Sequence, residues 1–347
     1  MNKRINWIDW AKFFAITMVV FGHIPEYPES ALLQYVCSFH MPLFFFISGY
    51  LTKRRTDTLD NIKRHWHSLV IPYFLYNVIF YPYWLTRLIL DNNGEISFYN
   101  IAIKPLNGVL LGQANTQFSC SVNGVTWFLA ALLIMKIILN LCNRSKHSIP
   151  LMLMICLLSV SLYISDQYYS FTHVLLLKGL IKCIPFYILG YLLQHSCIMS
   201  NNNIMRCFPV VLIMFSISFL TFYAYLEANI FAIKITAWYI TCITSIIAIL
   251  FFCKLLDKIH HNIITTFSNG TIVIMGLHWL FIGTINYIIQ HFTQTVGEFG
   301  YEWYTALLLS LLIDILLYPI IILFQAKMPW MLGKKNTYLT NKHSIST

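Results

Sequence analysis

Charged residues are scarce in this chain of 347 residues. Only 10% of them are Asp, Glu, Lys or Arg, whereas 58% are hydrophobic. Soluble globular proteins carry about 25% charged residues, and a soluble chain this apolar would expose patches large enough to cause aggregation. The composition therefore excludes a soluble protein and indicates an integral membrane protein.

Acidic residues are the scarcer charge, with 13 Asp and Glu against 23 Lys and Arg, which gives a formal net charge of +10. No basic stripe interleaved with aromatic residues lies outside the apolar segments, so we expect no nucleic-acid partner. The basic residues lie mainly in the connections between apolar segments, where Lys and Arg set the orientation of a membrane protein. The lipid bilayer is therefore the first partner that the sequence predicts.

Paired-cysteine motifs, zinc-ligand spacings, nucleotide-binding loops and a Ser-His-Asp arrangement are all absent. The nine cysteines are scattered, which argues against a disulfide framework and is typical of inert buried thiols. We therefore expect no metal site and no permanently bound cofactor. The basic start at Lys3 and Arg4 mimics a signal peptide, but no small-residue cleavage site follows His23, which favours a retained first helix.

Long apolar runs are what the chain has in abundance, and a run of about 20 residues suffices to cross a bilayer. The expected spans are 7–24, 31–51, 67–90, 125–142, 149–166, 174–194, 207–226, 234–256, 270–291 and 303–325. The sequence therefore predicts an all-α integral membrane protein, a bundle of about ten transmembrane helices that forms a single domain over 1–347.

The connections between these spans divide by charge. Placing the N-terminus in the cytoplasm puts the basic segments "TKRRTDTLDNIKRH", "NRSKHS" and "GKKNTYLTNK" inside and the acidic segments "PEYPES" and "GEFGYE" outside. This is the positive-inside pattern. It predicts a multi-pass protein of the plasma (inner) membrane with a cytoplasmic tail over about 326–347. The long outer connection at 91–124 is of a length that is usually functional or disordered.

The first apolar run carries three ionisable residues, Asp9, Lys12 and His23. On a helix Asp9 and Lys12 share a face, and His23 lies three turns beyond Lys12, roughly 16 Å along the axis. An ion at the centre of the bilayer costs at least about 2.5–3.5 kcal/mol, so this stripe should face the interior of the bundle or a wet cavity. A plainer reading stays open, in which Asp9 and Lys12 pair near the helix end, Lys12 snorkels and His23 lies at the interface.

Later segments of the sequence help to interpret these three ionisable residues. "MPLFFFISGY" at 41–50 ends the second run, and "NIKRHWHSLVIPYFLY" at 61–76 opens the third. Together with the D-x-x-K…H pattern of the first run, they resemble the acyltransferase-3 family of membrane acyltransferases, and within it the fucose O-acetylase-like branch. "WFLAALL" at 127–133 and "SNGTIVIMGLHWLF" at 268–281 resemble later segments of that family. Many members have Arg where this chain has Lys12, and Lys lacks the planar fork of a guanidinium.

The resemblance implies an O-acyltransferase that moves an acetyl group from cytoplasmic acetyl-CoA to a hydroxyl of a carbohydrate or lipid-linked glycan of the cell envelope. Such a transfer needs a base for the hydroxyl proton and groups that stabilise the oxyanion. Histidine titrates near neutral pH, so His23 is the expected base, and an acyl-carrying nucleophile is its second possible role. Asp9 and Lys12 complete the expected catalytic set.

The phosphates of CoA need cations, and we expect other basic residues to lie near Lys12 at the same membrane face. We expect the donor to be bound by Lys12 with Arg54, Arg55 and Arg64, next to Lys63. The alternative is that the loop cluster only sets topology, and the sequence does not decide between the two.

Several other residues are candidates to line the site: His40, Ser48, Tyr50, Trp127 and His278. Each also has a structural reading, because interior histidines, small residues at helix contacts and interfacial aromatics are all common in membrane proteins. Gly49, in particular, predicts close helix packing.

Two questions stay open from the sequence. Asp314 in the last run is costly to bury and has no evident partner. A transporter or flippase for a lipid-linked sugar would also use intramembrane charges, and it would need no acetyl-CoA.

Overall fold

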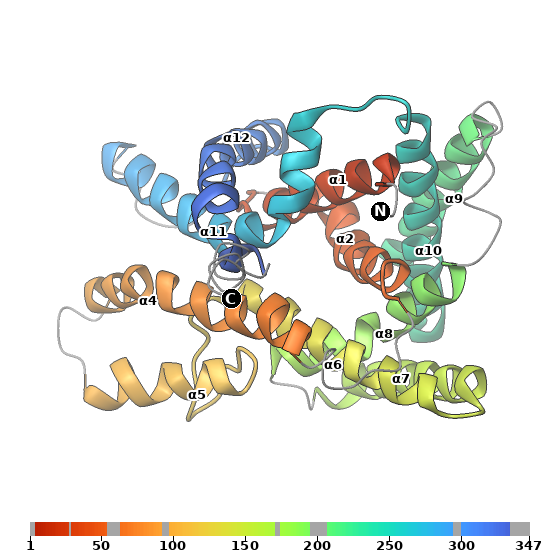
Figure 1. Cartoon of the computed structure of the whole chain (residues 1–347), viewed down its shortest axis with the longest axis horizontal. Coiled ribbons are helices and arrows are strands. Elements are labelled where there is room, and N and C mark those ends of the chain that lie inside the picture. Colours follow the sequence, from red (N-terminus) through yellow and green to blue (C-terminus); the bar gives the residue numbers. More distant parts are fainter. Residues whose placement is uncertain are drawn as a thin grey trace, which may run out of the picture. The chain divides into compact units, whose positions relative to one another are not determined.

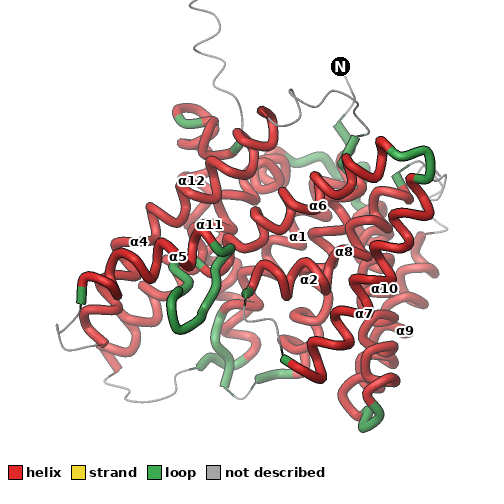
Figure 2. The backbone as a smooth tube through the Cα atoms, turned by 90° about the horizontal axis from the view of Figure 1, so that it is seen from below, coloured by secondary structure: helices red, strands yellow, loops and turns green. Residues whose placement is uncertain are grey.

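The structure is a computed structural model, which describes residues 4–27, 29–53, 63–91, 97–170, 174–194, 207–293 and 300–333. These described residues form helices, and the only β-type pairs among them are isolated bridges (Figure 2). The predicted all-α class is therefore confirmed.

Most of the described residues lie in long helices. They are α1 (Asn6–His23), α2 (Ala31–Tyr50), α4 (Ile71–Asp91), α6 (Trp127–Arg144), α7 (Ser148–Tyr169), α8 (Leu175–Leu193), α9 (Cys207–Glu227), α10 (Phe231–Leu255), α11 (Asn262–Thr293) and α12 (Trp303–Lys327). Shorter elements are the π-helical turns η1 (Trp66–Val70) and η2 (Tyr99–Ile103), α5 (Lys104–Leu110), and the 3-10 turns η3 (Gly124–Thr126) and η5 (Pro329–Leu332).

Eight of the described helices are long and apolar enough to cross a membrane, namely α2 and α6 to α12. They establish a multi-pass membrane protein. α1 and α4 are of similar length but are not among the eight. In α1 the apolar sequence is interrupted by Asn6, Asp9, Lys12 and His23. The total of ten spans and the cytoplasmic placement of both termini stay predictions.

Helix α11 begins eight residues before the expected span at 270–291. Its 32 residues correspond to roughly 48 Å of helix, well over the ~30 Å of a hydrocarbon core. A search for apolar runs does not find its first turns, because their sequence "NIITTFSN" is rich in Asn, Thr and Ser. This polar beginning of α11 becomes important at the candidate site.

Two compact units make up the chain, and each is described by itself. The first comprises Met1–Thr52, Pro185–Thr271 and Thr284–Ile315, and the second comprises Lys53–Ile184, Ile272–Gly283 and Leu316–Thr347. The prediction of a single domain over 1–347 stays a prediction.

In the first unit α1 packs against α2 and α10, and α10 packs against α2 and α9 (Figure 1). The second half of α8 approaches α2 closely, because a Cβ on Gly49 would overlap the carbonyl of Tyr187, and one on Gly190 would overlap the carbonyl of Phe46. The close packing that the sequence predicts at Gly49 is therefore present.

In the second unit the described part of the 91–124 connection folds onto α4. The buried amide Nε2 of Gln113 donates to Oδ1 of Asn77 at 2.7 Å and to the hydroxyl of Thr126 at 2.9 Å. Next to them, the side chain of Asn123 donates to the carbonyl of Gly276 at 3.0 Å. This connection therefore brings the segments that begin at 124 and 272 together.

The last described residues, up to Gly333, also pack in the second unit. The hydroxyl of Tyr76 donates to the carbonyl of Met331 at 3.0 Å, and Met331 is buried. The expected tail at 326–347 therefore begins with the end of α12 and a buried turn, and its residues from 334 on lie outside the described part of the chain.

Candidate functional site

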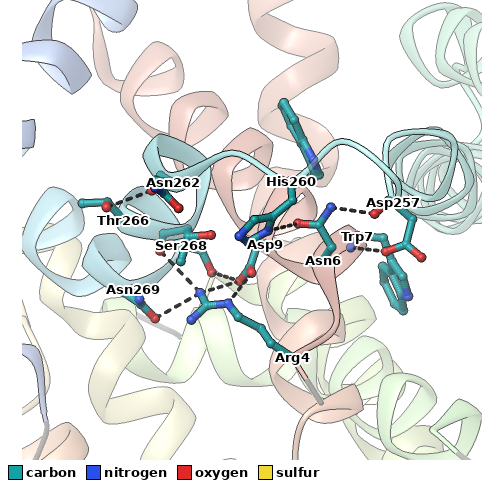
Figure 3. A network of polar contacts seen from close by, with 12 residues as sticks. Arg4, Asn6, Trp7, Asp9, Asp257, His260, Asn262, Thr266, Ser268 and Asn269 are labelled. Carbon is teal, nitrogen blue, oxygen red and sulfur yellow. Dashed lines mark hydrogen bonds and ion pairs between the residues drawn. The ribbon is translucent and has the colours of Figure 1, made fainter.

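The first turn of α1 buries a carboxylate. Asp9 is only 5% exposed, and Arg4 binds it with two hydrogen bonds: Nε to Oδ2 at 2.5 Å and Nη2 to Oδ1 at 2.9 Å (Figure 3). Paired guanidinium–carboxylate bonds of this kind are the strong ones among charged hydrogen bonds. The Arg4 side chain is itself 45% exposed, so one end of the pair reaches solvent.

The polar beginning of α11 completes this contact. The hydroxyl of Ser268 donates to Oδ1 of Asp9 at 2.6 Å, and Nη2 of Arg4 reaches Oδ1 of Asn269 at 3.3 Å and the carbonyl of Thr265 at 3.4 Å. We call Arg4, Asp9 and Ser268 the α1–α11 clasp. It joins residues more than 250 positions apart in the sequence, and Figure 3 shows their side chains turned toward one another.

The backbone at the start of α1 is fixed as well. The Trp7 N–H, which has no partner within the helix, donates to Oδ1 of Asp257 at 2.9 Å. The amide of Asn6 donates to the carbonyls of Asp257 and Ile259 at 2.6 and 2.9 Å. Because free N–H groups at a helix start need such acceptors, the connection between α10 and α11 holds the first turn of α1 in place.

Lys12 and His23 both lie on α1 and are half-buried. His40 of α2 is 8% exposed, and its Nδ1 lies 3.0 Å from the carbonyl of Val36. A methyl group on Gly22 would lie 3.7 Å from Cε1 and 3.9 Å from Nε2 of His40. The structure thus brings His40 beside the residue that precedes His23.

The other two candidates on α2 lie toward the start of α1. The ring of Tyr50 packs edge-on against Trp7 with a centroid distance of 5.5 Å. Ser48 is half-buried, and its carbonyl accepts a hydrogen bond from Thr52 at 2.8 Å. Along α2, therefore, His40 belongs to the His23 end of α1 and Tyr50 to the Asp9 end.

Trp127 and His278 belong to the second unit. His278 is fully buried, with Nδ1 2.8 Å from the carbonyl of Ile274. Trp127 is half-buried and packs so closely on Gly179 that a Cβ there would overlap its ring. Both contacts are those of interior side chains.

The expected donor-binding residues are only partly described. Arg54 and Arg55 lie outside the described residues, whereas Lys63 and Arg64 are exposed just before η1, in the second unit. Among the described residues, no group of three or more His, Cys, Asp or Glu side chains could hold a metal ion.

Asp314 has the partner that the sequence did not reveal. It is 2% exposed on α12, and the hydroxyl of Thr17 on α1 donates to its Oδ2 at 2.7 Å. Thr17 lies 297 positions before Asp314 in the sequence, so no local motif could reveal this contact.

Comparison with known proteins gives this helical membrane protein a class. The family profile described as "Acyltransferase domain" matches residues 5–324. The chain therefore belongs to the acyltransferase-3 family, and the resemblance read from its motifs is confirmed.

One curated relative is similar over part of the chain. Nodulation protein NolL of Mesorhizobium japonicum (strain LMG 29417 / CECT 9101 / MAFF 303099) is 27% identical over 230 residues, which cover 62% of this chain and 55% of the relative. The chain thus matches about half the length of that relative. No solved structure matches this chain.

Proposed function

We propose that this protein is a membrane O-acetyltransferase of the fucose O-acetylase-like branch. It takes the acetyl group of cytoplasmic acetyl-CoA and transfers it to a hydroxyl of a cell-envelope carbohydrate or lipid-linked glycan. The observation that carries the proposal is the arrangement of α1, whose start is clasped through Asp9 and whose end presents His23 beside the helix segment of His40. Membership of the acyltransferase-3 family supports it.

His23 is the proposed general base. Its neutral imidazole takes the proton of the acceptor hydroxyl while the oxygen attacks the thioester carbonyl. When the tetrahedral intermediate collapses, the C–S bond breaks, and the leaving CoA sulfur takes the proton from the His23 imidazolium, which restores the neutral base. The products are the acetyl ester of the sugar and free CoA.

Lys12 and the basic residues after α2 are the proposed donor site. A lysine is a compact charge that can meet a phosphate without the two-pronged geometry of arginine. Lys12, Arg54, Arg55 and Arg64 would hold the phosphates of CoA, and the pantetheine arm would run along α1 toward His23. The roughly 16 Å of helix between Lys12 and His23 is the distance over which that arm must extend.

Asp9 acts in this proposal as a positioning residue. Its carboxylate is occupied by Arg4 and Ser268, so it fixes the helix that carries Lys12 and His23. Ser48, Tyr50, Trp127 and His278 remain candidates to line the site.

The test uses membranes that contain the full chain, acetyl-labelled acetyl-CoA and an extract of lipid-linked and surface glycans. We expect His23→Ala to lower the label entering base-labile glycan ester at least about 100-fold, which is the lower range for loss of a general base. The control is His291→Ala, an exposed histidine in the last turn of α11, which should transfer as wild type does.

Two other results would change the proposal. Undiminished transfer by His23→Ala would keep the enzyme but move the base, first to His40 or His278. No label transfer by wild type, with sugar-lipid movement across the bilayer instead, would replace the enzyme by a transporter.

A further inference from the structure

A second buried carboxylate lies three residues beyond His23. Glu26 is 7% exposed and forms an isolated parallel bridge with Tyr301. Around it the Tyr301 N–H donates to the carbonyl of Pro25 at 2.8 Å, and the Tyr27 N–H donates to the carbonyl of Tyr301 at 3.4 Å. The segment before α12 therefore fixes the backbone on both sides of Glu26.

Only one oxygen of this carboxylate has a hydrogen-bond partner among the described residues. Oε2 accepts a hydrogen bond from the Ser30 N–H at 3.1 Å, at the beginning of α2. Oε1 is buried and has no hydrogen-bond partner among the described residues. A buried acceptor without a partner destabilises the fold, and more so when it is charged. The hydrogen bond to the beginning of α2 accounts for the burial of Oε2, but nothing among the described residues accounts for the burial of Oε1.

The hydroxyl of Tyr301, the residue that bridges to Glu26, is already used. The hydroxyl of Tyr301 donates to Oδ1 of Asn286 at 2.7 Å. Burial raises the pKa of Tyr301 above its usual value, so the hydroxyl stays protonated at physiological pH and that hydrogen bond persists. Among the described residues, therefore, no donor completes Oε1 of Glu26, and this oxygen can accept a hydrogen bond from a bound molecule.

The residues next to Glu26 in the chain are partly or largely exposed. Tyr27 is 64% exposed, and Pro25 and His23 are half-buried. A ligand at this end of α1 would thus meet the proposed base and Glu26 within one short stretch of chain.

We propose that Glu26 is an acceptor-binding residue, whose Oε1 accepts a hydrogen bond from a hydroxyl of a neutral, polyhydroxylated sugar. A sugar fits because it carries several neutral hydroxyl donors: one can bind Oε1 while its neighbour gives its proton to His23. This inference rests on the proposed function, because it takes the acceptor to be a carbohydrate.

The experiment uses the full-length protein in detergent and radiolabelled methyl glycosides of hexoses and deoxyhexoses as probes. We measure glycoside binding by equilibrium dialysis, and in parallel the KM for glycoside and for acetyl-CoA. Glu26→Gln should weaken binding and raise the glycoside KM about tenfold, which corresponds to about 1.4 kcal/mol. The KM for acetyl-CoA and the acceptor-independent hydrolysis of acetyl-CoA should stay at the wild-type values.

Two variants separate binding from structure. Glu29→Gln changes an exposed neighbouring acid and should bind as wild type does. Ser30→Ala removes the hydroxyl that accepts from the Leu33 N–H at the start of α2, so it should lower stability and leave glycoside binding unchanged. If Ser30→Ala weakens binding as much as Glu26→Gln does, Glu26 acts only through the fold and the proposal is overturned.

The remaining outcomes are equally decisive. Unchanged glycoside binding by Glu26→Gln, or no binding of any glycoside by wild type, overturns the proposal. Glycoside binding that Glu26→Gln weakens, in a wild type that transfers no acetyl group, would keep this site and reject only the acetyltransferase reaction.

Discussion

The two ends of α1 bury acidic side chains to almost the same extent and treat them in opposite ways. Asp9 is 5% exposed and Glu26, three residues past the helix end, is 7% exposed. Asp9 accepts hydrogen bonds from Nε and Nη2 of Arg4 and from the hydroxyl of Ser268. Glu26 has one described donor, the Ser30 N–H. Burial therefore does not separate the two residues, whereas their hydrogen-bond partners do.

This difference in hydrogen-bond partners indicates different roles for the two carboxylates. A buried carboxylate with a guanidinium partner holds elements together, and removal of the partner is strongly destabilising. A buried carboxylate with an open oxygen carries a cost that the fold does not offset, and local departures of this kind are expected at functional sites. In our proposal, the carboxylate at one end of α1 holds the fold together and the carboxylate past the other end binds a ligand.

The largest effect on stability should come from breaking the clasp. Arg4→Ala leaves the buried Asp9 without its cation. We expect a loss of about 2–3 kcal/mol in the free energy of unfolding, below the ~3–5 kcal/mol of a fully buried pair because Arg4 is half-exposed. Denaturant titration in detergent micelles, followed by tryptophan fluorescence, measures it. Lys258→Ala, an exposed cation after α10, should cost under about 0.5 kcal/mol.

A double variant checks the cause of this loss. Arg4→Met combined with Asp9→Leu removes both charges together, and apolar replacements of buried pairs are often neutral. The double variant should therefore regain most of the stability that Arg4→Ala loses. A double variant as unstable as Arg4→Ala would mean that the shape of the clasp, and not the unpaired charge, is what matters.

An intermediate effect is expected at Ser268. Ser268→Ala removes one donor at 2.6 Å from Asp9 and leaves the guanidinium, so the loss should be about 1.5 kcal/mol, the lower range for a hydrogen bond to a charged group. Ser216→Ala is the control, because its exposed hydroxyl bonds only the carbonyl of Leu212 one turn back. Equal losses for the two variants would remove Ser268 from the clasp.

Much of the fold was predictable from the sequence, because a membrane selects for long apolar runs that a simple scan detects. The helix that departs most is α11, whose polar first turns lie outside any apolar run. Those turns carry Ser268, which opens the segment 268–281 that the resemblance had singled out. The family-like sequence indicated that this region has a role, but it did not reveal the contact with Asp9. Spacing along one helix carries no information about a partner 259 residues away.

The site was predictable in part for a related reason. Helical periodicity places Asp9, Lys12 and His23 on one helix, as the structure has them. It suggested a possible pair of Asp9 with Lys12, whereas the ion pair that holds Asp9 is with Arg4, a residue that looked only like part of a basic start. Glu26 was part of the acidic outer segment "PEYPES", and that segment does not reveal its bridge with Tyr301, 275 positions later.

The smallest predicted effect gives the sharpest test of the comparison, because the same change from carboxylate to amide is made at both ends of α1. Asp9→Asn puts an amide NH2 among the donors of Arg4 and Ser268, so it should lose about 2 kcal/mol or more of unfolding free energy. In Glu26→Gln the amide oxygen can keep the bond from Ser30, and the NH2 takes the place of Oε1, which meets no described donor. Removing an incompletely satisfied buried charge offsets the loss of charge at the start of α2, so Glu26→Gln should lie within about 0.5 kcal/mol of wild type. A loss at Glu26 as large as that at Asp9, in the same titration, would mean that Oε1 is bound within the fold, and the two ends of α1 would then be alike.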